Sequence, residues 1–200
     1  VESQAFDLVH VDSLDLARYL PDCHGVPVMC VHHDIESALL RRRAGVEQSA
    51  WRRAYFGYQA ERMEDVERRW CGRVAMNVTV SERDRERVVA LAPGARVTVV
   101  PNGVDTTEFC PEDAAGEGVA FVGGTNPFPN LDALEFFARD VLPRLRARRP
   151  QLPITWIGRA SPEQQRDYAA QYGIELTGYL DDVRPKLRAA ACHIVPMRVG

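Results

Sequence analysis

The feature that most constrains the fold is a regular alternation of short apolar runs with longer segments of helical spacing. The apolar runs have the length of β-strands, and they occupy residues 6–13, 26–34, 74–81, 97–100, 118–124, 152–158, 174–180 and 193–197. Most segments between them place apolar residues three and four positions apart, as amphipathic helices do. Strands that alternate with helices of this length predict βαβ units, a parallel sheet and right-handed crossovers. The predicted fold class is therefore α/β, with Rossmann-like units.

A turn near the middle of the chain divides this series in two. The strand pattern of residues 97–100 ends in Pro-Asn-Gly at 101–103. This step favours a turn, because proline fixes φ while asparagine and glycine accept positive φ. An ordinary exit from a strand is one interpretation, and a joint between domains is the other. The small, polar stretch 111–118 is the best candidate for a linker. We expect one domain over residues 1–105 and a second over 106–200.

The longest helical pattern runs from Ile35 to Cys71, with Gly45 and Gly57 as candidate breaks. Apolar and aromatic side chains recur in it at helical spacing, and we expect them to face the core: Trp51, Tyr55, Tyr58, Met63, Val66 and Trp70. A stacking platform for a ligand is the alternative for the aromatic ones. The arginines at 41–43 are expected to form a solvated face, and contact with a membrane surface or an anionic acceptor is the alternative.

The balance of charges argues against a protein that binds the phosphate backbone of nucleic acids. The chain has 25 basic and 28 acidic residues and a formal net charge of −3, whereas nucleic-acid binders usually show a basic excess. Its five cysteines are widely spaced without a C-x-x-C pair, which favours free thiols in a reducing cytoplasm over disulfides or a zinc site. No apolar run has the length of a membrane span. Because the sequence begins with Val1 and not with an initiator methionine, we expect it to be a piece of a longer protein.

Glycines gather where the strands of the second half are expected to end. The segments concerned are Gly123-Gly124, Gly158-Arg159, Gly178-Tyr179 and Arg198 to Gly200. Ligands of parallel α/β sheets bind outside the carboxyl ends of the strands. Glycine at these points lets the backbone approach a ligand and lets amides face a phosphate. Four such segments on one edge predict a binding site there, although glycine at a single strand end is common.

Four stretches of the sequence, taken in order, resemble one enzyme family. VVPNGVDTTEF spans the turn, VAFVGGTNPFPNLDALEFFARDVLPRLRARRP follows it, and TWIGRASP and LTGYLDDVRPKLRAAACHIVPMRVG complete the series. Together they resemble the group 1, or GT4-type, retaining glycosyltransferases of the GT-B fold, in the subgroup whose first C-domain strand precedes a PN-x-DA helix. The resemblance covers the whole chain and is most specific from Val97 to Gly200.

This resemblance implies two Rossmann-like domains that face each other across a cleft. Residues 1–105 would be the later part of the N-terminal, acceptor-side domain, and residues 106–200 the earlier part of the C-terminal domain that holds a nucleotide-sugar donor. The implied reaction transfers a sugar to a glycan, lipid-linked or small-molecule acceptor with retention of configuration, as in bacterial polysaccharide biosynthesis. The implied location is the cytoplasm, with peripheral contact to the inner face of the membrane, and no metal or cofactor is implied beyond the donor.

The resemblance also assigns donor contacts to the strand ends of the second half. Gly123 and Gly124 would approach the donor diphosphate, and Gly200 would begin a glycine-rich loop beneath the donor. The residues implied as donor-binding are Gly123, Gly124, Asn130, Gly158, Arg159, Tyr179, Leu180, Arg198 and Gly200. Many family members carry an arginine and a lysine at positions that fall near Gly124 and Pro129 here. The phosphate-pairing cation is therefore unassigned, with Arg159, Arg198 or a residue after Gly200 as candidates.

Two histidines are the candidate catalytic residues of the first half. His10 is expected to end the first strand and His33 to follow the second, where the family often has a histidine that touches donor or acceptor. A structural hydrogen bond is the alternative for each. The run His-His-Asp at 32–34 could suggest a metal, but adjacent residues on an extended strand point to opposite faces, so no metal site is expected.

Parts of the family pattern lie outside these 200 residues. Its paired glutamates would come just after Gly200 and its N-terminal glycine loop would precede Val1, so this chain alone is expected to be inactive. Two other functions remain open. A Rossmann-type oxidoreductase would need G-x-G-x-x-G after a strand, and GVAFVGGTNP lacks that spacing. A non-catalytic relative that binds sugar nucleotides is the second alternative, which the missing phosphate cations keep open.

Overall fold

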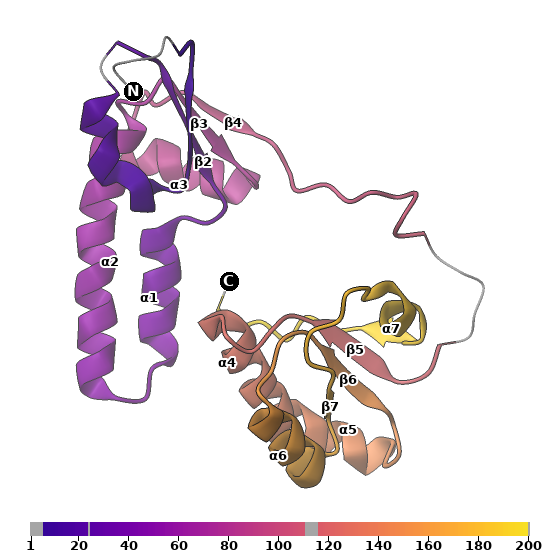
Figure 1. Cartoon of the computed structure of the whole chain (residues 1–200). Coiled ribbons are helices and arrows are strands. Elements are labelled where there is room, and N and C mark those ends of the chain that lie inside the picture. The colour runs from indigo at the N-terminus through magenta and orange to yellow at the C-terminus, as the bar shows by residue number, and fades with distance from the viewer. Residues whose placement is uncertain (1–5, 24, 111–115, 200) are drawn as a thin grey trace. The chain divides into compact units, whose positions relative to one another are not determined.

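The computed structural model describes residues 6–23, 25–110 and 116–199. The chain divides into two compact units, Val1–Gly103 and Val104–Gly200, and each contains a parallel β-sheet with helices packed on it (Figure 1). The predicted α/β fold class is confirmed. The division falls directly after the Pro-Asn-Gly segment at 101–103. The predicted turn is wrong: the backbone there is irregular, and neither Asn102 nor Gly103 has a positive φ. Of the linker candidate, 111–118, residues 111–115 lie outside the described part of the chain.

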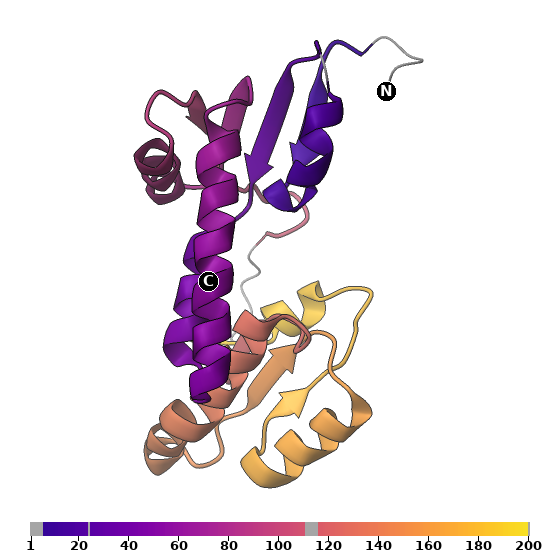
Figure 2. The same cartoon turned by 90° about the vertical axis from the view of Figure 1, so that its left-hand side faces the viewer.

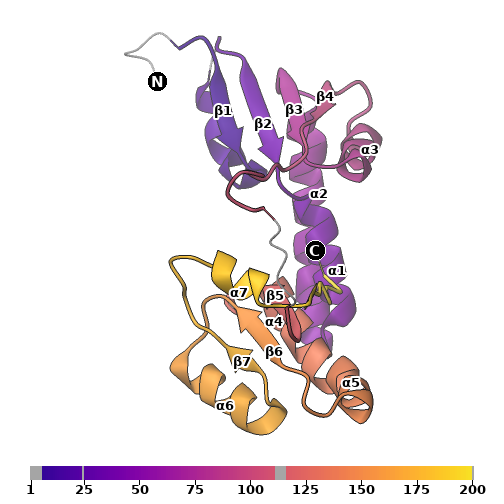
Figure 3. The same cartoon turned by 90° about the vertical axis from the view of Figure 1, so that its right-hand side faces the viewer.

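The first unit is built on a parallel sheet whose strand order follows the sequence, β1-β2-β3-β4. Its strands are β1 (Val9–Asp12), β2 (Val28–His32), β3 (Met76–Thr79) and β4 (Val97–Val99). The labels in Figure 3 show the four strands side by side. Right-handed crossovers that always step in one direction place all connecting helices on the same face of a sheet. The core therefore lies on that face, where Val11, Cys30 and Val88 are buried together.

The helices of this unit lie in the segments where the sequence predicts helices, but the first is a 3₁₀ helix and the long pattern from Ile35 to Cys71 is divided in two. They are η1 (Leu14–Asp22), a 3₁₀ helix, and the α-helices α1 (Glu36–Val46), α2 (Ala50–Cys71) and α3 (Glu82–Leu91). The long helical pattern breaks after Val46, next to Gly45, but continues through Gly57, so only one of the two candidate breaks is real. Ser81 caps α3 by accepting a hydrogen bond from the amide of Asp84 at 3.2 Å.

The prediction that all aromatic residues of α2 face the core is wrong for its first half. Met63, Val66 and Trp70 pack against the core, as expected. Trp51, Tyr55 and Tyr58, in contrast, are 72%, 50% and 58% exposed. The reason is the length of α2: with α1 it forms a helical hairpin that projects beyond the sheet (Figure 2). Within the first unit, only α1 packs against this projecting half, and the side chains on its opposite face are exposed.

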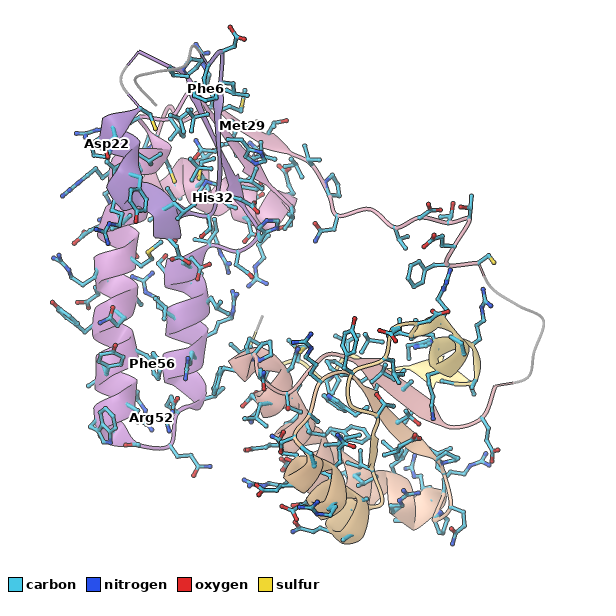
Figure 4. All side chains as sticks on the ribbon, in the orientation of Figure 1. Phe6, Asp22, Met29, His32, Arg52 and Phe56 are labelled. Carbon is cyan, nitrogen blue, oxygen red and sulfur yellow. The ribbon has the colours of Figure 1, made fainter. Side chains whose placement is uncertain are left out.

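The arginines at 41–43 do not form the solvated face that was expected. Arg41 pairs with Glu64 of α2, and Arg42 lies 3.9 Å from Asp34. The guanidinium carbon of Arg43 lies 3.9 Å from the centre of the Phe56 ring. The contacts of Arg41 and Arg43 hold the two helices of the hairpin together, and Figure 4 shows Phe56 between them.

The second unit contains a parallel sheet of order β7-β6-β5-β8. Its strands are β5 (Val119–Val122), β6 (Ile154–Ile157), β7 (Glu175–Leu176) and β8 (Cys192–His193). The helices are α4 (Phe128–Phe136), which continues through a π-helical turn, η2 (Phe137–Val141), into α5 (Leu142–Arg148), and then α6 (Pro162–Tyr172) and α7 (Arg184–Arg188). The core is centred on Trp156, whose ring stacks on Phe121 with 3.9 Å between ring centres.

Local sequence signals explain where α6 begins and ends. Ser161 and Gln164 form a reciprocal capping box at its first turn. Gly173 ends the helix in the left-handed region, with φ of 62°, which glycine adopts without a steric penalty. No helix in the described ranges is long and apolar enough to cross a membrane.

All five cysteines are free thiols, as the sequence predicts. Cys30 and Cys71 are buried in the core of the first unit. Burial raises the pKa of each of these two thiols to about 12, so both remain protonated and unreactive at neutral pH.

Candidate functional site

The second unit has a topological switch point between β5 and β8. The chain steps from β5 outward to β6 and β7, and then returns to pair β8 with the other side of β5. Ligands of open parallel sheets bind outside the carboxyl ends of the strands at such a point. A cavity of about 300 Å³ lies beside these two strands, lined by Val122, Asn130, Ile194, Val195 and Met197 among others. The sequence did not point to the β8 side of this cavity, where the lining is apolar apart from His193.

Three glycines bring the backbones that follow β5 and β6 into close contact. Gly158 has φ of 146°, and a Cβ there would come within 2.6 Å of the Gly124 nitrogen and 2.7 Å of the Gly123 carbonyl carbon. The Gly123 amide donates a hydrogen bond to Ile157 O at 2.8 Å, and the Thr125 amide donates to Arg159 O at the same distance. Gly158 is thus required by the packing of the two strand ends. The structure brings Gly123, Gly124, Gly158 and Arg159 together.

Asn130 positions the loop after β5. It lies in the first turn of α4, which has Pro127 as a cap residue without a side-chain hydrogen bond. The Asn130 side-chain nitrogen donates to Gly124 O at 3.0 Å, and the Trp156 indole nitrogen donates to Gly123 O at 3.0 Å. The two glycine carbonyls are therefore held by side chains from the helix and the core.

Arg159 and Tyr179 form an exposed pair at the ends of β6 and β7. The guanidinium carbon of Arg159 lies 4.9 Å from the centre of the Tyr179 ring. The turn that places Tyr179 here contains Gly178, which has φ of 74° and bridges to Gly158. Leu180 follows and is half-buried. In the part of the chain that the structure describes, Arg159 contacts no carboxylate, so its charge remains available to an anionic ligand.

Arg198, the other candidate cation, is engaged with a carboxylate. Its Nε donates to Asp132 Oδ2 at 3.0 Å, a second nitrogen bonds the other carboxylate oxygen, and the group lies over the Phe136 ring at 4.9 Å. This hydrogen bonding to Asp132 raises the pKa of Arg198 further. The pair ties the segment after β8 to α4. Asp132 gave no separate signal in the sequence.

The first unit has a second cavity, of about 210 Å³, at the carboxyl ends of β1 and β2. His33 lies at its edge, exposed, with Nε2 2.7 Å from Asp12 Oδ1. Ser13, which follows β1, has φ of 104° and is the one non-glycine residue with positive φ in the described ranges. Backbone strain of this kind persists only where the surrounding structure imposes it, and it is frequent at functional sites.

His32 also lines this cavity. In the sequence it stood out only as part of the run His-His-Asp at 32–34. Its Nε2 is 3.0 Å from Asn77 Oδ1. The Asn77 amide nitrogen donates to Cys71 O and Arg96 O, so Asn77 Oδ1 must accept, and His32 carries its proton on Nε2. Burial lowers the pKa of His32, which keeps the ring neutral. The partner comes from β3, 45 residues away, and no local spacing could reveal it.

Carboxyl groups surround the same cavity. Glu67, from α2, is buried and accepts hydrogen bonds from the amide and the hydroxyl of Ser37. Burial raises the pKa of Glu67, and burial likewise raises the pKa values of Asp34 and Glu36 at the cavity. This wall is therefore rich in acceptors and unfavourable to an anion.

The prediction that His10 ends the first strand is wrong. The strand continues to Asp12, and His10 lies within it with an exposed side chain on the face opposite the buried Val11. It does not line the cavity beside His33. Gly200 lies outside the described residues. No group of histidine, cysteine, aspartate or glutamate side chains in the described ranges could hold a metal ion.

Comparison with protein families decides the assignment. The family model described as Glycosyltransferase Family 4 matches residues 1–108, more than half of the chain. The chain belongs to glycosyltransferase family 4. A further model, described as Glycosyl transferases group 1, matches residues 116–200. The resemblance to GT4-type glycosyltransferases that the sequence motifs indicate is thus confirmed at the level of the family. No curated protein sequence matches the chain.

Solved structures show the fold of this family 4 member. Sucrose-phosphate synthase from Thermosynechococcus elongatus is similar over 98% of the chain, with a TM-score of 0.68 and 14% identity. A crystal structure of TarM is similar over 93% of the chain, with a TM-score of 0.60 and 10% identity. A mutant of S. aureus TarM in complex with fondaparinux, alpha-GlcNAc-glycerol and UDP has a TM-score of 0.62 at 10% identity, again over 93% of the chain. The family 4 chain spans 52%, 35% and 36% of these three proteins, respectively.

Proposed function

We propose that this protein is a retaining glycosyltransferase that moves a sugar from a nucleotide-sugar donor to a hydroxyl-bearing acceptor. One observation carries the proposal: in a chain whose two halves match glycosyltransferase models, Arg159 has no carboxylate partner among the described residues and lies beside Gly124 at the strand ends of the second unit. A cation next to closely packed backbone at a switch point is suited to a diphosphate. The UDP named with the TarM mutant supports a nucleotide in this kind of fold.

The chemistry required of the protein at the donor is stabilisation of charge. When the bond between sugar and diphosphate breaks, negative charge develops on the departing nucleoside diphosphate. Arg159 is the group in the described part that we assign to this charge, and Tyr179 and Leu180 border the nucleoside. Asn130 and Arg198 act through the positions of Gly124 and of the segment after β8, respectively. These roles explain why a nucleophile–base pair is not needed in the second unit.

We assign the acceptor to the cavity of the first unit. His33, oriented by Asp12, contacts acceptor or donor there, and the carboxyl groups of Asp34 and Glu36 offer hydrogen-bond acceptors. Hydroxyl groups of a neutral sugar or polyol fit such a wall, and a phosphate next to these carboxylates does not. The acceptor class is therefore a glycan, a lipid-linked sugar or a small polyol that binds through an uncharged end. His10 stays a candidate from the sequence, outside this cavity.

The other features of the proposal follow from the family. The unpaired, buried thiols support a reducing compartment, and we place the protein in the cytoplasm. No metal or cofactor beyond the donor takes part. The described chain spans about half or less of the similar structures, and we propose that it is inactive by itself. A non-catalytic relative that only binds sugar nucleotides is the second candidate, favoured by the absence of basic residues at positions 124 and 129.

A binding measurement tests the donor assignment. Isothermal titration of the full-length protein with UDP, GDP and dTDP should give saturable binding of one of them. Arg159→Ala should weaken that binding about 10- to 100-fold, because a hydrogen bond between charged groups contributes about 1.5–3 kcal/mol. Arg166→Ala, an exposed arginine on α6, is the matched control and should bind as wild type. Binding of NAD(H) alone, or equal affinities for the two variants, would contradict the proposal.

A further inference from the structure

His32 is a buried histidine that has no role in the proposed transfer reaction so far. It is the last residue of β2 and is 3% exposed. Its side chain lines the cavity at the carboxyl ends of β1 and β2. Packing alone does not require a polar ring at this position, because a buried polar pair can be replaced by apolar groups of the same shape at little cost. The two ring nitrogens indicate what the ring does there.

Asn77 determines which ring nitrogen of His32 carries the proton. The Asn77 side-chain nitrogen donates to Cys71 O at 2.8 Å and to Arg96 O at 3.1 Å, so the side-chain oxygen faces the ring. This oxygen lies 3.0 Å from His32 Nε2 and can only accept a hydrogen bond. Burial lowers the pKa of His32, so the ring is neutral at neutral pH and carries its one proton on Nε2. Nδ1 therefore has a lone pair that accepts hydrogen bonds.

The lone pair of His32 Nδ1 is open to the cavity. Within residues 6–23, 25–110 and 116–199, Nδ1 makes no hydrogen bond, and it is not among the side-chain atoms that are buried there without a partner. Nδ1 thus keeps accessible surface, and we place this surface in the cavity that the ring lines. Because an acceptor in the interior is costly to leave unpaired, Nδ1 needs a hydrogen-bond donor from the cavity.

The charged groups that share the cavity with His32 are acceptors as well. Carboxyl groups of Asp15, Asp34, Glu36 and Glu67 line it. A ligand group that binds among such atoms has to donate, and a hydroxyl donates without bringing a further negative charge. The cavity volume of about 210 Å³ equals that of about seven water molecules in the liquid. This space accommodates one end of a sugar or polyol.

We propose that His32 Nδ1 accepts a hydrogen bond from a hydroxyl group of the acceptor and thereby selects acceptors that have a free hydroxyl at that position. The inference rests on the proposed function, which places the acceptor in this cavity, and it adds a residue that determines specificity. A site built to bind a hydroxyl rejects an analogue that lacks it, because the polar atom of the site is then left unpaired.

The tautomer of His32 tests the first step without donor or acceptor. Long-range proton–nitrogen NMR spectra of the isotope-labelled, full-length protein distinguish a protonated ring nitrogen from an unprotonated one. The signals that disappear in His32→Gln belong to this ring. We expect a neutral ring with its proton on Nε2 at neutral pH. A proton on Nδ1, or on both nitrogens, would overturn the proposal.

Two substitutions separate the roles of the two ring nitrogens. A glutamine amide reaches the position of Nε2, so His32→Gln keeps the bond to Asn77 and loses the acceptor in the cavity. An asparagine amide reaches only the position of Nδ1, so His32→Asn keeps an acceptor in the cavity and loses the bond to Asn77. A merely structural role of His32 makes His32→Asn the more damaging variant in every assay, whereas the proposed contact makes His32→Gln the more damaging one for acceptor binding.

Turnover by the full-length protein is then measured with glycerol, myo-inositol and D-glucose as acceptors. His32→Gln should raise the KM for the acceptor about 5- to 30-fold and leave the KM for the donor unchanged. His32→Asn should raise the acceptor KM less than about threefold, although it should unfold at lower urea concentration. Equal acceptor KM values for wild type and His32→Gln, or a larger rise in His32→Asn, would overturn the proposal.

Deoxy analogues of the acceptor that is used identify the hydroxyl. Loss of one hydroxyl should raise the wild-type KM by a factor similar to that of His32→Gln, and the same analogue should change the KM of His32→Gln little, because the contact is already lost. Additive effects for every hydroxyl would contradict the contact.

A failure of the proposed function gives a different result. Wild type would then release no nucleoside diphosphate with any donor and acceptor, and NMR would decide the inference by itself. A shift of the His32 Nδ1 signal with glycerol, myo-inositol or D-glucose would support a site for hydroxyl groups. The absence of a shift with all three would overturn it.

Discussion

The close approach of the strand ends in the second unit makes a quantitative prediction for Gly158→Ala. The new Cβ would lie 2.6 Å from the Gly124 nitrogen and 2.7 Å from the Gly123 carbonyl carbon, and both are backbone atoms that cannot turn aside. The residue would also hold φ of 146°, which L side chains rarely adopt. Strain and overpacking together should cost about 2–5 kcal/mol in the free energy of unfolding.

The assay uses the core of the same unit as its reporter. Trp156 is buried and its indole nitrogen bonds Gly123 O, so its fluorescence reports the unfolding of this region in urea. Gly57→Ala is the control: this glycine lies inside α2 of the first unit with nothing within 4 Å of its added Cβ, so the change should not lower the midpoint that Trp156 reports. It should stabilise the helix by about 0.5–1 kcal/mol. If Gly158→Ala shifted the urea midpoint no more than Gly57→Ala, the close-contact explanation of this glycine would be refuted.

Three further predictions concern other contacts. Asn77→Ala should lower the free energy of unfolding of the first unit by about 2–3 kcal/mol, seen in urea titration, because it leaves the Cys71 carbonyl and the His32 ring without a buried partner. Because burial lowers the pKa of His32 in the folded protein, the unfolded chain binds a proton at this residue more readily. The free energy of unfolding should therefore be highest above pH 6.5 and should fall as the pH drops from there toward the folded pKa. His32→Gln should flatten this dependence in urea titrations at several pH values. Ser161→Ala should cost about 1 kcal/mol through loss of the capping box, measured by thermal unfolding, and unchanged stability would contradict the cap.

The sequence was most informative where local patterns determine local structure. The alternation of apolar and helical segments was sufficient for the α/β class, because strand and helix periods are properties of a few neighbouring residues. The Pro-Asn-Gly segment precedes the division between the units, although it forms no turn. Gly123, Gly124 and Gly158 indicated which strand ends approach each other, because a Cβ at Gly158 would collide with the backbone of the other two residues.

Contacts between distant segments were not accessible in this way. The bond between His32 and Asn77 and the pair of Arg198 with Asp132 each join elements more than forty residues apart. Trp51 is exposed because α2 projects beyond its sheet. The spacing of apolar residues along a helix does not predict how far the helix extends past the sheet on which it packs. Periodicity indicates which residues share a face, whereas the tertiary structure decides what covers that face.

The most direct test of the account is turnover by the full-length protein. It should be incubated with UDP-, GDP- and dTDP-sugars together with a lipid-linked or polyol acceptor, and release of free nucleoside diphosphate should be followed. The account predicts release from one class of donor, a strong loss of release in Arg159→Ala, and retention of it in Arg166→Ala. Release that is equal in both variants would contradict the role of Arg159, and the absence of release from every donor, with nucleotide binding intact, would leave the non-catalytic binding protein as the function.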